Sequence, residues 1–260
     1  MYARLSTEQT SLYLSRIGYC GPRRADVDVL AELMNLHTLH IPFENFDVCF
    51  LRREPELTLE ALFDKLILRR RGGYCFELNG LFTYLLESMG FEVRRCAARI
   101  VHGPALPPPA HEMLIVCTGG KEYFCDVGFG GPVPRIPMEM RYDAPLSCIS
   151  GNTYLFEKRG RLTALQILGQ DGFSDIMLFD ETPCDPVDFL PLNTFCACSP
   201  KQPFVHKPMA WLRTPEGKIS LDGNTLRIKE GDELAERILS TPEEVVSAIS
   251  EYFGIDVGHL

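Results

Sequence analysis

Residues 71–79 of the chain read Arg-Gly-Gly-Tyr-Cys-Phe-Glu-Leu-Asn and place one cysteine, Cys75, between a double glycine and an amphipathic run. Beyond Cys75, apolar residues recur at helical spacing as far as Met89, so the sequence predicts a helix that begins at or beside the cysteine. Unpaired backbone N–H groups and the positive end of the helix dipole favour an anion at that position. We therefore expect Cys75 to be stabilised as thiolate, the form of cysteine that attacks carbonyl carbons.

The composition is that of a globular protein without a generally basic surface. The 260 residues are 45% hydrophobic and 23% charged, and the formal net charge is -9. This acidity argues against nucleic acid or an anionic membrane as partner, and no apolar run approaches the length of a membrane span. The start of the chain lacks the apolar segment of a signal peptide, and the ten cysteines are scattered. We therefore expect a cytoplasmic protein with free thiols.

The spacing of apolar residues changes along the chain. Helical spacing dominates up to Gly90, and runs of strand-forming residues separated by turn dipeptides follow. The expected strands lie at residues 92–101, 111–118, 121–127, 153–158, 161–167, 210–213, 218–221 and 224–229. A capping box with proline at 241–244 then predicts a final helix. Helices, then strands, then strands with a helix predict an α+β protein of two or three units.

A predicted hairpin supplies a base and an acid that could serve Cys75. If the Gly-Gly dipeptide at 119–120 forms a two-residue loop, the register places His111 and Asp126 on the same face of the two strands as diagonal neighbours. Their side chains are then within reach of a hydrogen bond, whereas a slip of one residue would put them on opposite faces. The carboxylate would orient the imidazole, and the imidazolium would stabilise the thiolate.

Structural roles compete with this catalytic interpretation. A cysteine is often a small buried hydrophobic residue, and a histidine and an aspartate on a hairpin are often a surface pair. From the residues alone, both interpretations of Cys75, His111 and Asp126 remain open. Cys196 and Cys198, with His206, lack the second pair of ligands typical of a zinc site, so we expect no metal.

Four motifs resemble those of the arylamine N-acetyltransferase family, and the resemblance implies a bacterial member. Besides the stretch at 71–79, they are His-Ile-Pro-Phe-Glu-Asn at 40–45, His-Glu-Met at 111–113 and Asp-Val-Gly-Phe-Gly at 126–130. The resemblance implies a helical N-terminal domain (1–90), a central antiparallel β-barrel (91–185) and a C-terminal α/β lid (186–260). It also implies a papain-like or transglutaminase-like Cys-His-Asp core with Cys75 as nucleophile, His111 as base and acid, and Asp126 as the residue that orients it.

The resemblance further implies the reaction and the partners. Acetyl-CoA would be the co-substrate, without a metal, and would acetylate Cys75 in the first half of a ping-pong reaction. A small arylamine or hydrazine, or the oxygen of an N-hydroxyarylamine, would accept the acetyl group, as in xenobiotic metabolism. The protein would act as a monomer or homodimer.

Further residues take roles by the same resemblance. Phe129, Ile100 and Val101 would line the amine pocket, although core packing explains the last two equally well. Gly128, Gly130 and Gly131 would let the backbone approach CoA, although such a run is also an ordinary turn after a strand. Arg71 and Glu44 would form a buried ion pair beneath the site. These roles follow only from the resemblance of the motifs.

One departure from the family pattern leaves the details of CoA binding open. Gln202 stands where the family usually has serine. Alternative functions keep the three catalytic side chains and change the substrates: an amide synthase of the family, an N-acyltransferase that uses longer acyl-CoA, or a Cys-His-Asp hydrolase. A degenerate binding protein on the same fold would have an unreactive Cys75.

Overall fold

The first third of the chain folds into helices that begin at the capping residues of the sequence. The computed structural model describes residues 4–142, 144–148 and 151–257. Ser6 accepts a hydrogen bond from the backbone N–H of Gln9 at 3.1 Å, and Asp26 accepts one from Val29 at 3.0 Å. The helices of this part are α1 (Thr7–Ile17), α2 (Val27–His40), α3 (Phe46–Cys49), α4 (Leu59–Phe63), which continues as a π-helix over Asp64–Leu68, and α5 (Cys75–Ser88).

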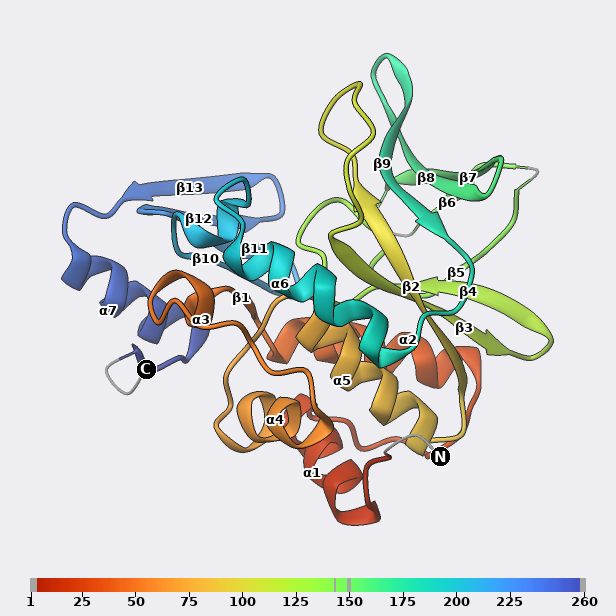
Figure 1. The fold of residues 1–260 in the computed structure, drawn as a ribbon, viewed down its shortest axis with the longest axis horizontal. Coiled ribbons are helices and arrows are strands. Elements are labelled where there is room, and N and C mark those ends of the chain that lie inside the picture. Colours follow the sequence, from red (N-terminus) through yellow and green to blue (C-terminus); the bar gives the residue numbers. More distant parts are fainter. Residues whose placement is uncertain (1–3, 143, 149–150, 258–260) are drawn as a thin grey trace.

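A curled antiparallel sheet follows, with its strands in the order β5-β4-β3-β2-β9-β8-β7-β6 (Figure 1). Thr118 pairs with Lys121, so the predicted hairpin register is confirmed. Phe124 lies inside the curl, with its ring centroid 6.0 Å from those of both Phe156 and Phe179. The strands are β2 (Glu92–Ile100), β3 (His111–Thr118), β4 (Lys121–Cys125), β5 (Met138–Glu139), β6 (Leu146–Ser147), β7 (Thr153–Arg159), β8 (Leu162–Gly169) and β9 (Gly172–Asp180).

A second antiparallel sheet has the order β1-β10-β11-β12-β13. Its first strand, β1 (Phe43–Glu44), comes from the helical third of the chain and thereby ties the two parts together. Ile249 and Phe253 of the last helix pack with Phe46 in the core beside this sheet. The remaining elements are β10 (Met209–Arg213), β11 (Gly217–Asp222), β12 (Thr225–Glu230), β13 (Glu233–Ile238) and α7 (Pro242–Phe253).

Helix α6 (Leu190–Cys198) connects the two sheets and was not expected from the sequence. A short 3-10 helix at Pro186–Phe189 leads into it, and another follows at Pro203–Val205. Phe189 and Cys196 are both buried in the core formed by the first helices. Pro191 gives no obstacle, because it lies in the first turn, where its missing N–H has no helical partner.

Helix α5 runs through the largest hydrophobic core, and Figure 1 shows it in the middle of the molecule. Residues 75–86 are all buried, and the helix contacts β2 and β3 as well as α1 and α4. A helix that is buried all round is fixed by packing on every side. Its first residue, Cys75, is therefore held rigidly against the first strands of the curled sheet.

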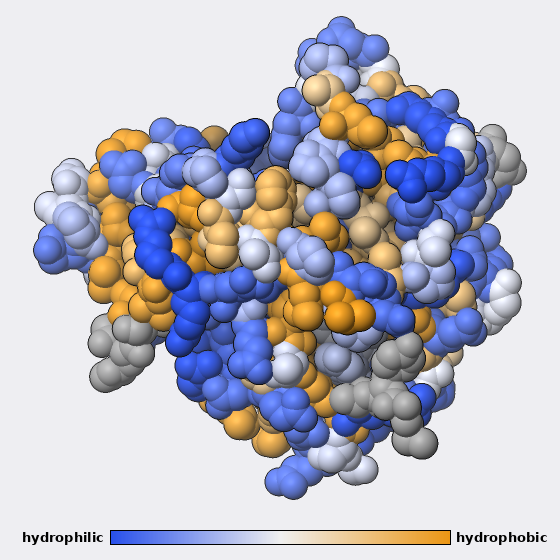
Figure 2. Space-filling model, in the orientation of Figure 1, coloured by the Kyte–Doolittle hydropathy of each residue, from blue (hydrophilic) through white to orange (hydrophobic). Residues whose placement is uncertain are grey.

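The visible surface is mixed in polarity. Figure 2 shows hydrophilic and hydrophobic residues interspersed over this face, with hydrophobic residues gathered near the middle, where α6 runs in Figure 1, and on the left, where the second sheet lies. Scattered apolar side chains are normal on a protein surface. Within residues 4–257, apart from the gaps given above, no helix is both long and apolar enough to cross a membrane.

A buried histidine of α2 predicts a dependence of stability on pH. Burial lowers the pKa of His37 to about 3, with Arg16 and His40 adding in the same direction. Below the ordinary pKa of about 6.5 the unfolded chain takes up a proton that the folded protein refuses, so stability falls as the pH drops from about 6.5 toward 3. From pH 7 to pH 5, this group alone should lower the free energy of unfolding by about 2 kcal/mol.

Urea unfolding at both pH values of His37→Gln and His40→Gln tests this expectation. Glutamine can still accept the hydrogen bond that the Tyr13 hydroxyl makes with His37 Nδ1 at 2.8 Å. His40 is the control, because it is exposed on the same helix. Between pH 7 and pH 5, the free energy of unfolding should fall by about 2 kcal/mol less in the His37 variant than in the His40 control. An identical pH effect in the two variants would contradict the assignment.

Candidate active site

Helix α5 begins at Cys75, as the sequence predicts, and the double glycine allows a close approach of neighbouring segments. A Cβ on Gly72 would collide with the carbonyl of Pro42, and a Cβ on Gly73 would collide with the side chain of Glu77. Glu77 uses that closeness to accept a hydrogen bond from the Tyr74 N–H at 3.0 Å. The glycines thus let the chain bend tightly into the helix that carries the cysteine.

His111 and Asp126 lie side by side, because one begins β3 and the other directly follows β4. His111 Nε2 is 2.7 Å from Asp126 Oδ2, and both residues are buried. The imidazole also hydrogen-bonds the thiol of Cys75, which is 3% exposed. The structure therefore brings together the three side chains that the sequence proposed as nucleophile, base and orienting acid.

Asn79 holds this arrangement in place, and the sequence reasoning missed its role. Its Nδ2 donates to Asp126 Oδ1 at 3.0 Å and to the carbonyl of Glu112 at 2.6 Å. Its Oδ1 accepts from the N–H of Val127 at 3.0 Å. The available signal was position, since Asn79 follows Cys75 by four residues and so shares its face of the helix. This one amide ties α5 to β3 and to the segment that follows β4.

The electrostatics of the triad differ from the expectation for the thiol. Burial raises the pKa of the Cys75 thiol, while His111 and the backbone N–H of Glu112 act in the opposite direction. The expected lowering is therefore wrong, because the helix terminus is closed off from water. For His111, burial opposes the imidazolium, but Asp126 and then Cys75 outweigh it and raise the pKa to about 10. His111 is thus a stronger proton acceptor than a free imidazole.

The segment after Asp126 passes directly over the site. The ring of Phe129 makes an edge contact with His111, with centroids 5.5 Å apart. A Cβ on Gly128 would lie 2.7 Å from the Cα of Cys75, so glycine permits this close approach. The spaces left by Gly130 and Gly131 are filled by the rings of Trp211 and Phe129, respectively. The protein's own packing accounts for these glycines, and their contact with CoA stays a prediction.

The other expected pocket residues lie farther along the curled sheet. Ile100 ends β2 and packs against the core of that sheet, and the N–H of Val101 donates to the carbonyl of Ile176 at 3.0 Å. Their part in an amine pocket stays a prediction. Cys196 of α6, in contrast, lies close to the site. Its thiol donates to the carbonyl of Ala110 at 3.5 Å, and the Cys75 thiol lies 4.0 Å from the same oxygen.

The sequence predicts no metal centre at Cys196, Cys198 and His206. Among the described residues, no group of three His, Cys, Asp or Glu side chains is arranged to hold a metal ion. Cys196 is buried, whereas Cys198 is exposed. The two cysteines of the Cys-x-Cys pattern therefore have different surroundings.

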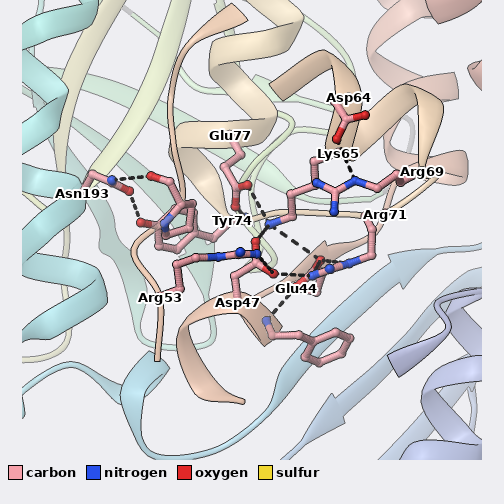
Figure 3. Close-up of polar contacts among 12 residues, drawn as sticks. Glu44, Asp47, Arg53, Asp64, Lys65, Arg69, Arg71, Tyr74, Glu77 and Asn193 are labelled. Carbon is pink, nitrogen blue, oxygen red and sulfur yellow. Dashed lines mark hydrogen bonds and ion pairs between the residues drawn. The ribbon is translucent and has the colours of Figure 1, made fainter. Parts of the chain in front are cut away.

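A buried network of charges lies beneath the start of α5 (Figure 3). Arg71 Nη2 is 2.6 Å from Glu44 Oε1 and 3.0 Å from Asp47 Oδ1, so the structure contains the expected ion pair between Arg71 and Glu44. Lys65 Nζ joins the same network at 2.8 Å from Asp47 Oδ2 and 2.7 Å from Glu77 Oε1. Since Glu77 also binds the N–H of Tyr74, this network fixes the residue that precedes Cys75.

Removal of one cation from this network should destabilise the fold. In Arg71→Ala, Glu44 and Asp47 lose a buried partner, and we expect the free energy of unfolding to fall by about 3–5 kcal/mol. Arg69→Ala is the control, because Arg69 forms its ion pair with Asp64 at the surface, where such pairs contribute under about 1 kcal/mol. Chemical denaturation of both variants makes the comparison. Equal stability of the two would show that the network adds nothing to the fold.

The fold and the site together define a class of protein. A buried cysteine that hydrogen-bonds a histidine, which is in turn oriented by a carboxylate, is the arrangement of thiol enzymes that form covalent acyl intermediates. The mixed α/β architecture places these residues where a central helix meets the edge of a curled sheet.

Comparisons with known proteins identify the family. The N-acetyltransferase family model matches residues 26–260. The arylamine N-acetyltransferase of Mycobacterium tuberculosis is 35% identical over 254 residues, which are 95% of this chain and 89% of that protein. The Salmonella typhimurium arylamine N-acetyltransferase / N-hydroxyarylamine O-acetyltransferase is 31% identical, over 94% of this chain and 88% of that protein. The solved structure of Mycobacterium marinum arylamine N-acetyltransferase in complex with CoA has a TM-score of 0.88 and 33% identity, covering 96% of this chain and 94% of that one. The chain belongs to the arylamine N-acetyltransferase family.

Proposed function

We propose that this protein transfers the acetyl group of acetyl-CoA to the nitrogen of arylamines and arylhydrazines, and to the oxygen of N-hydroxyarylamines, through an acetyl-Cys75 thioester. The buried contact of Cys75 with His111, which is itself paired with Asp126 at 2.7 Å, carries the proposal. Membership of the family supplies the substrates, because one relative is named for both N- and O-acetyl transfer and another was solved with CoA.

The first half-reaction loads the enzyme. Cys75 and His111 share one proton, which lies on His111 when the thiolate attacks the thioester carbon of acetyl-CoA and then passes to the departing CoA thiolate. Asp126 favours the protonated imidazole that exists between these steps. The exchange of one thioester for another is nearly isoenergetic, so positioning matters more than driving force. Backbone N–H groups at the start of α5, together with that of Glu112, are candidates to stabilise the oxyanion.

The second half-reaction releases the product. A neutral arylamine attacks the acetyl carbon, His111 takes the proton that the nitrogen loses, and Cys75 leaves as thiolate and is reprotonated. Burial of Cys75 disfavours the competing attack by water, which a hydrolase would require. We propose that Phe129, Ile100 and Val101 line the amine site and that Gly128, Gly130 and Gly131 border the CoA arm. The ring of Phe129 beside His111 supports the first of these roles.

The division of the chain into domains is part of the same proposal. We infer a helical domain (1–90), an antiparallel β-barrel domain (91–185) and an α/β lid (186–260), around a papain-like or transglutaminase-like core. The order of helices, curled sheet and second sheet supports this division. Cytoplasmic location and a monomeric or homodimeric state stay predictions.

Intact-mass spectrometry after mixing the protein with acetyl-CoA, without an amine, tests the function. One added acetyl group, mapped to Cys75 and removed by 4-aminobenzoate or 5-aminosalicylate, is the expected result. A folded protein that gains no acetyl group would overturn acetyl-CoA as the donor, and propionyl-CoA and malonyl-CoA would then be tried. Loss of the acetyl group to water at the same rate as to the amine would instead indicate a hydrolase.

A further inference from the structure

Three cationic side chains gather beside the glycine segment that passes over the active site. Arg213 on β10 and Lys218 on β11 are register partners in the second sheet. Lys218 Nζ donates to the carbonyl of Gly130 at 3.0 Å. Arg135 lies close enough to both for the charges to repel one another. This group of Arg135, Arg213 and Lys218 is called the cationic cluster below.

Within the described part of the chain, the cationic cluster has no carboxylate partner, although Arg213 and Lys218 are half-buried and only Arg135 is exposed. Arg213 forms no ion pair there, and its Nη1 atom is shielded from water without a hydrogen-bond acceptor. Burial and then the charge of Arg135 lower the pKa of Arg213 to about 10. Burial, followed by Arg213 and Arg135, lowers the pKa of Lys218 as well. Within the described part of the chain, the protein therefore holds these like charges together without an ion pair to any of them.

The fully buried cations among the described residues all have acceptors: Arg16 donates to backbone carbonyls, and the others pair with carboxylates. Arg95 binds both carboxylate oxygens of Glu112, at 2.7 and 2.9 Å. Lys65 and Arg71 belong to the ion network beneath α5. Asp126 attracts Arg213 from a distance, but its own oxygens are occupied by His111, Asn79 and Gly128. An unpaired buried donor is unfavourable unless another molecule supplies the acceptor.

The cationic cluster also lies near the triad. The carbonyl that Lys218 binds belongs to Gly130, and the preceding residue, Phe129, touches the ring of His111. An anionic group bound by these cations would therefore be anchored a short distance from Cys75, with the rest of its molecule free to reach the thiol. Charge-assisted hydrogen bonds from arginine suit phosphate and carboxylate oxygens.

We propose that Arg213, Lys218 and Arg135 form a binding site for an oxyanion of a substrate, either a phosphate of acetyl-CoA or the carboxylate of an acidic arylamine. The inference rests on the proposed function for the identity of these substrates. Arg213 is its central residue, because a bound oxyanion supplies the acceptor that its Nη1 lacks. The substrate would thereby be positioned without any contact between the cationic cluster and the reacting atoms.

Calorimetric titration tests the site without depending on turnover. CoA is compared with pantetheine, which lacks phosphates, and 4-aminobenzoate with uncharged 4-methoxyaniline. Arg213→Gln and Lys218→Gln should weaken the binding of either CoA or 4-aminobenzoate about tenfold or more. Binding of the uncharged partner in that pair, pantetheine or 4-methoxyaniline, should be unchanged. Arg227→Gln is the control, because Arg227 lies on the same sheet but pairs with Glu236 at 2.7 Å.

The results distinguish phosphate from carboxylate as the bound oxyanion, and they test the oxyanion site separately from the proposed function. Weaker binding of CoA but not of pantetheine assigns the site to phosphate, and weaker binding of 4-aminobenzoate but not of 4-methoxyaniline assigns it to carboxylate. Equal losses within both pairs, or none, would overturn the proposal, since a merely structural role affects both members alike. Failure of acetyl transfer in the mass-spectrometric test would refute the proposed function, and the titrations would still decide whether the oxyanion site exists.

Discussion

Substitution of Cys75 by serine is expected to stop acetyl transfer. A serine hydroxyl is much less acidic than a thiol and would have to transfer its proton to His111 before it could attack a thioester. Because the three residues act as one unit, we expect a rate loss of roughly 10⁴-fold or more. The acetyl adduct seen with acetyl-CoA by intact-mass spectrometry should be absent, and the single-turnover rate should be near the background.

The control for this variant is Cys198→Ser, which changes an exposed thiol on α6. It should be acetylated as fast as the unchanged protein. Circular dichroism should show that both variants are folded, because serine is slightly smaller than cysteine and fits the space at the start of α5. Acetylation of the Cys75 variant at more than about a hundredth of the normal rate would place the nucleophile elsewhere.

The parts of the site that were predictable depend on local rules. The register of the hairpin follows from one Gly-Gly loop, and the parity of the strands then fixes that His111 and Asp126 share a face. The start of α5 follows from the break at the double glycine and the helical spacing beyond it. Both signals lie within about 15 residues of the groups that they position, so no knowledge of the tertiary fold was needed.

The parts that escaped prediction depend on contacts between distant segments. Nothing in the local sequence distinguishes Asn79 from other polar helix residues, because its role arises only where the hairpin packs against the helix. Whether the pKa of Cys75 is raised or lowered depends on how completely the curled sheet covers the helix terminus. Strand β13 was missed because its residues are exposed, so no alternation of buried and exposed side chains marks it.

Substitution of Asp126 by asparagine should nearly abolish activity while it preserves the shape of the site. Asp126 Oδ1 accepts hydrogen bonds from Asn79 at 3.0 Å and from the N–H of Gly128 at 2.9 Å, so the oxygen of the introduced amide keeps that position. Its NH₂ group must then face His111 Nε2, where the carboxylate oxygen now lies at 2.7 Å. The imidazole is forced into the tautomer whose proton is on Nδ1, the nitrogen left for Cys75.

The reversed tautomer cannot accept the proton of the thiol, so we expect acetylation of Cys75 to slow by about 10⁴-fold. The pKa of His111 should also fall, because burial opposes the imidazolium and the charge of Asp126 no longer outweighs it. Stopped-flow acetylation measures the rate, and thermal unfolding checks the fold, with Glu122→Gln on the exposed end of β4 as the control. A normal rate in the Asp126 variant would mean that His111 takes its orientation from elsewhere, and it would remove the carboxylate from the mechanism.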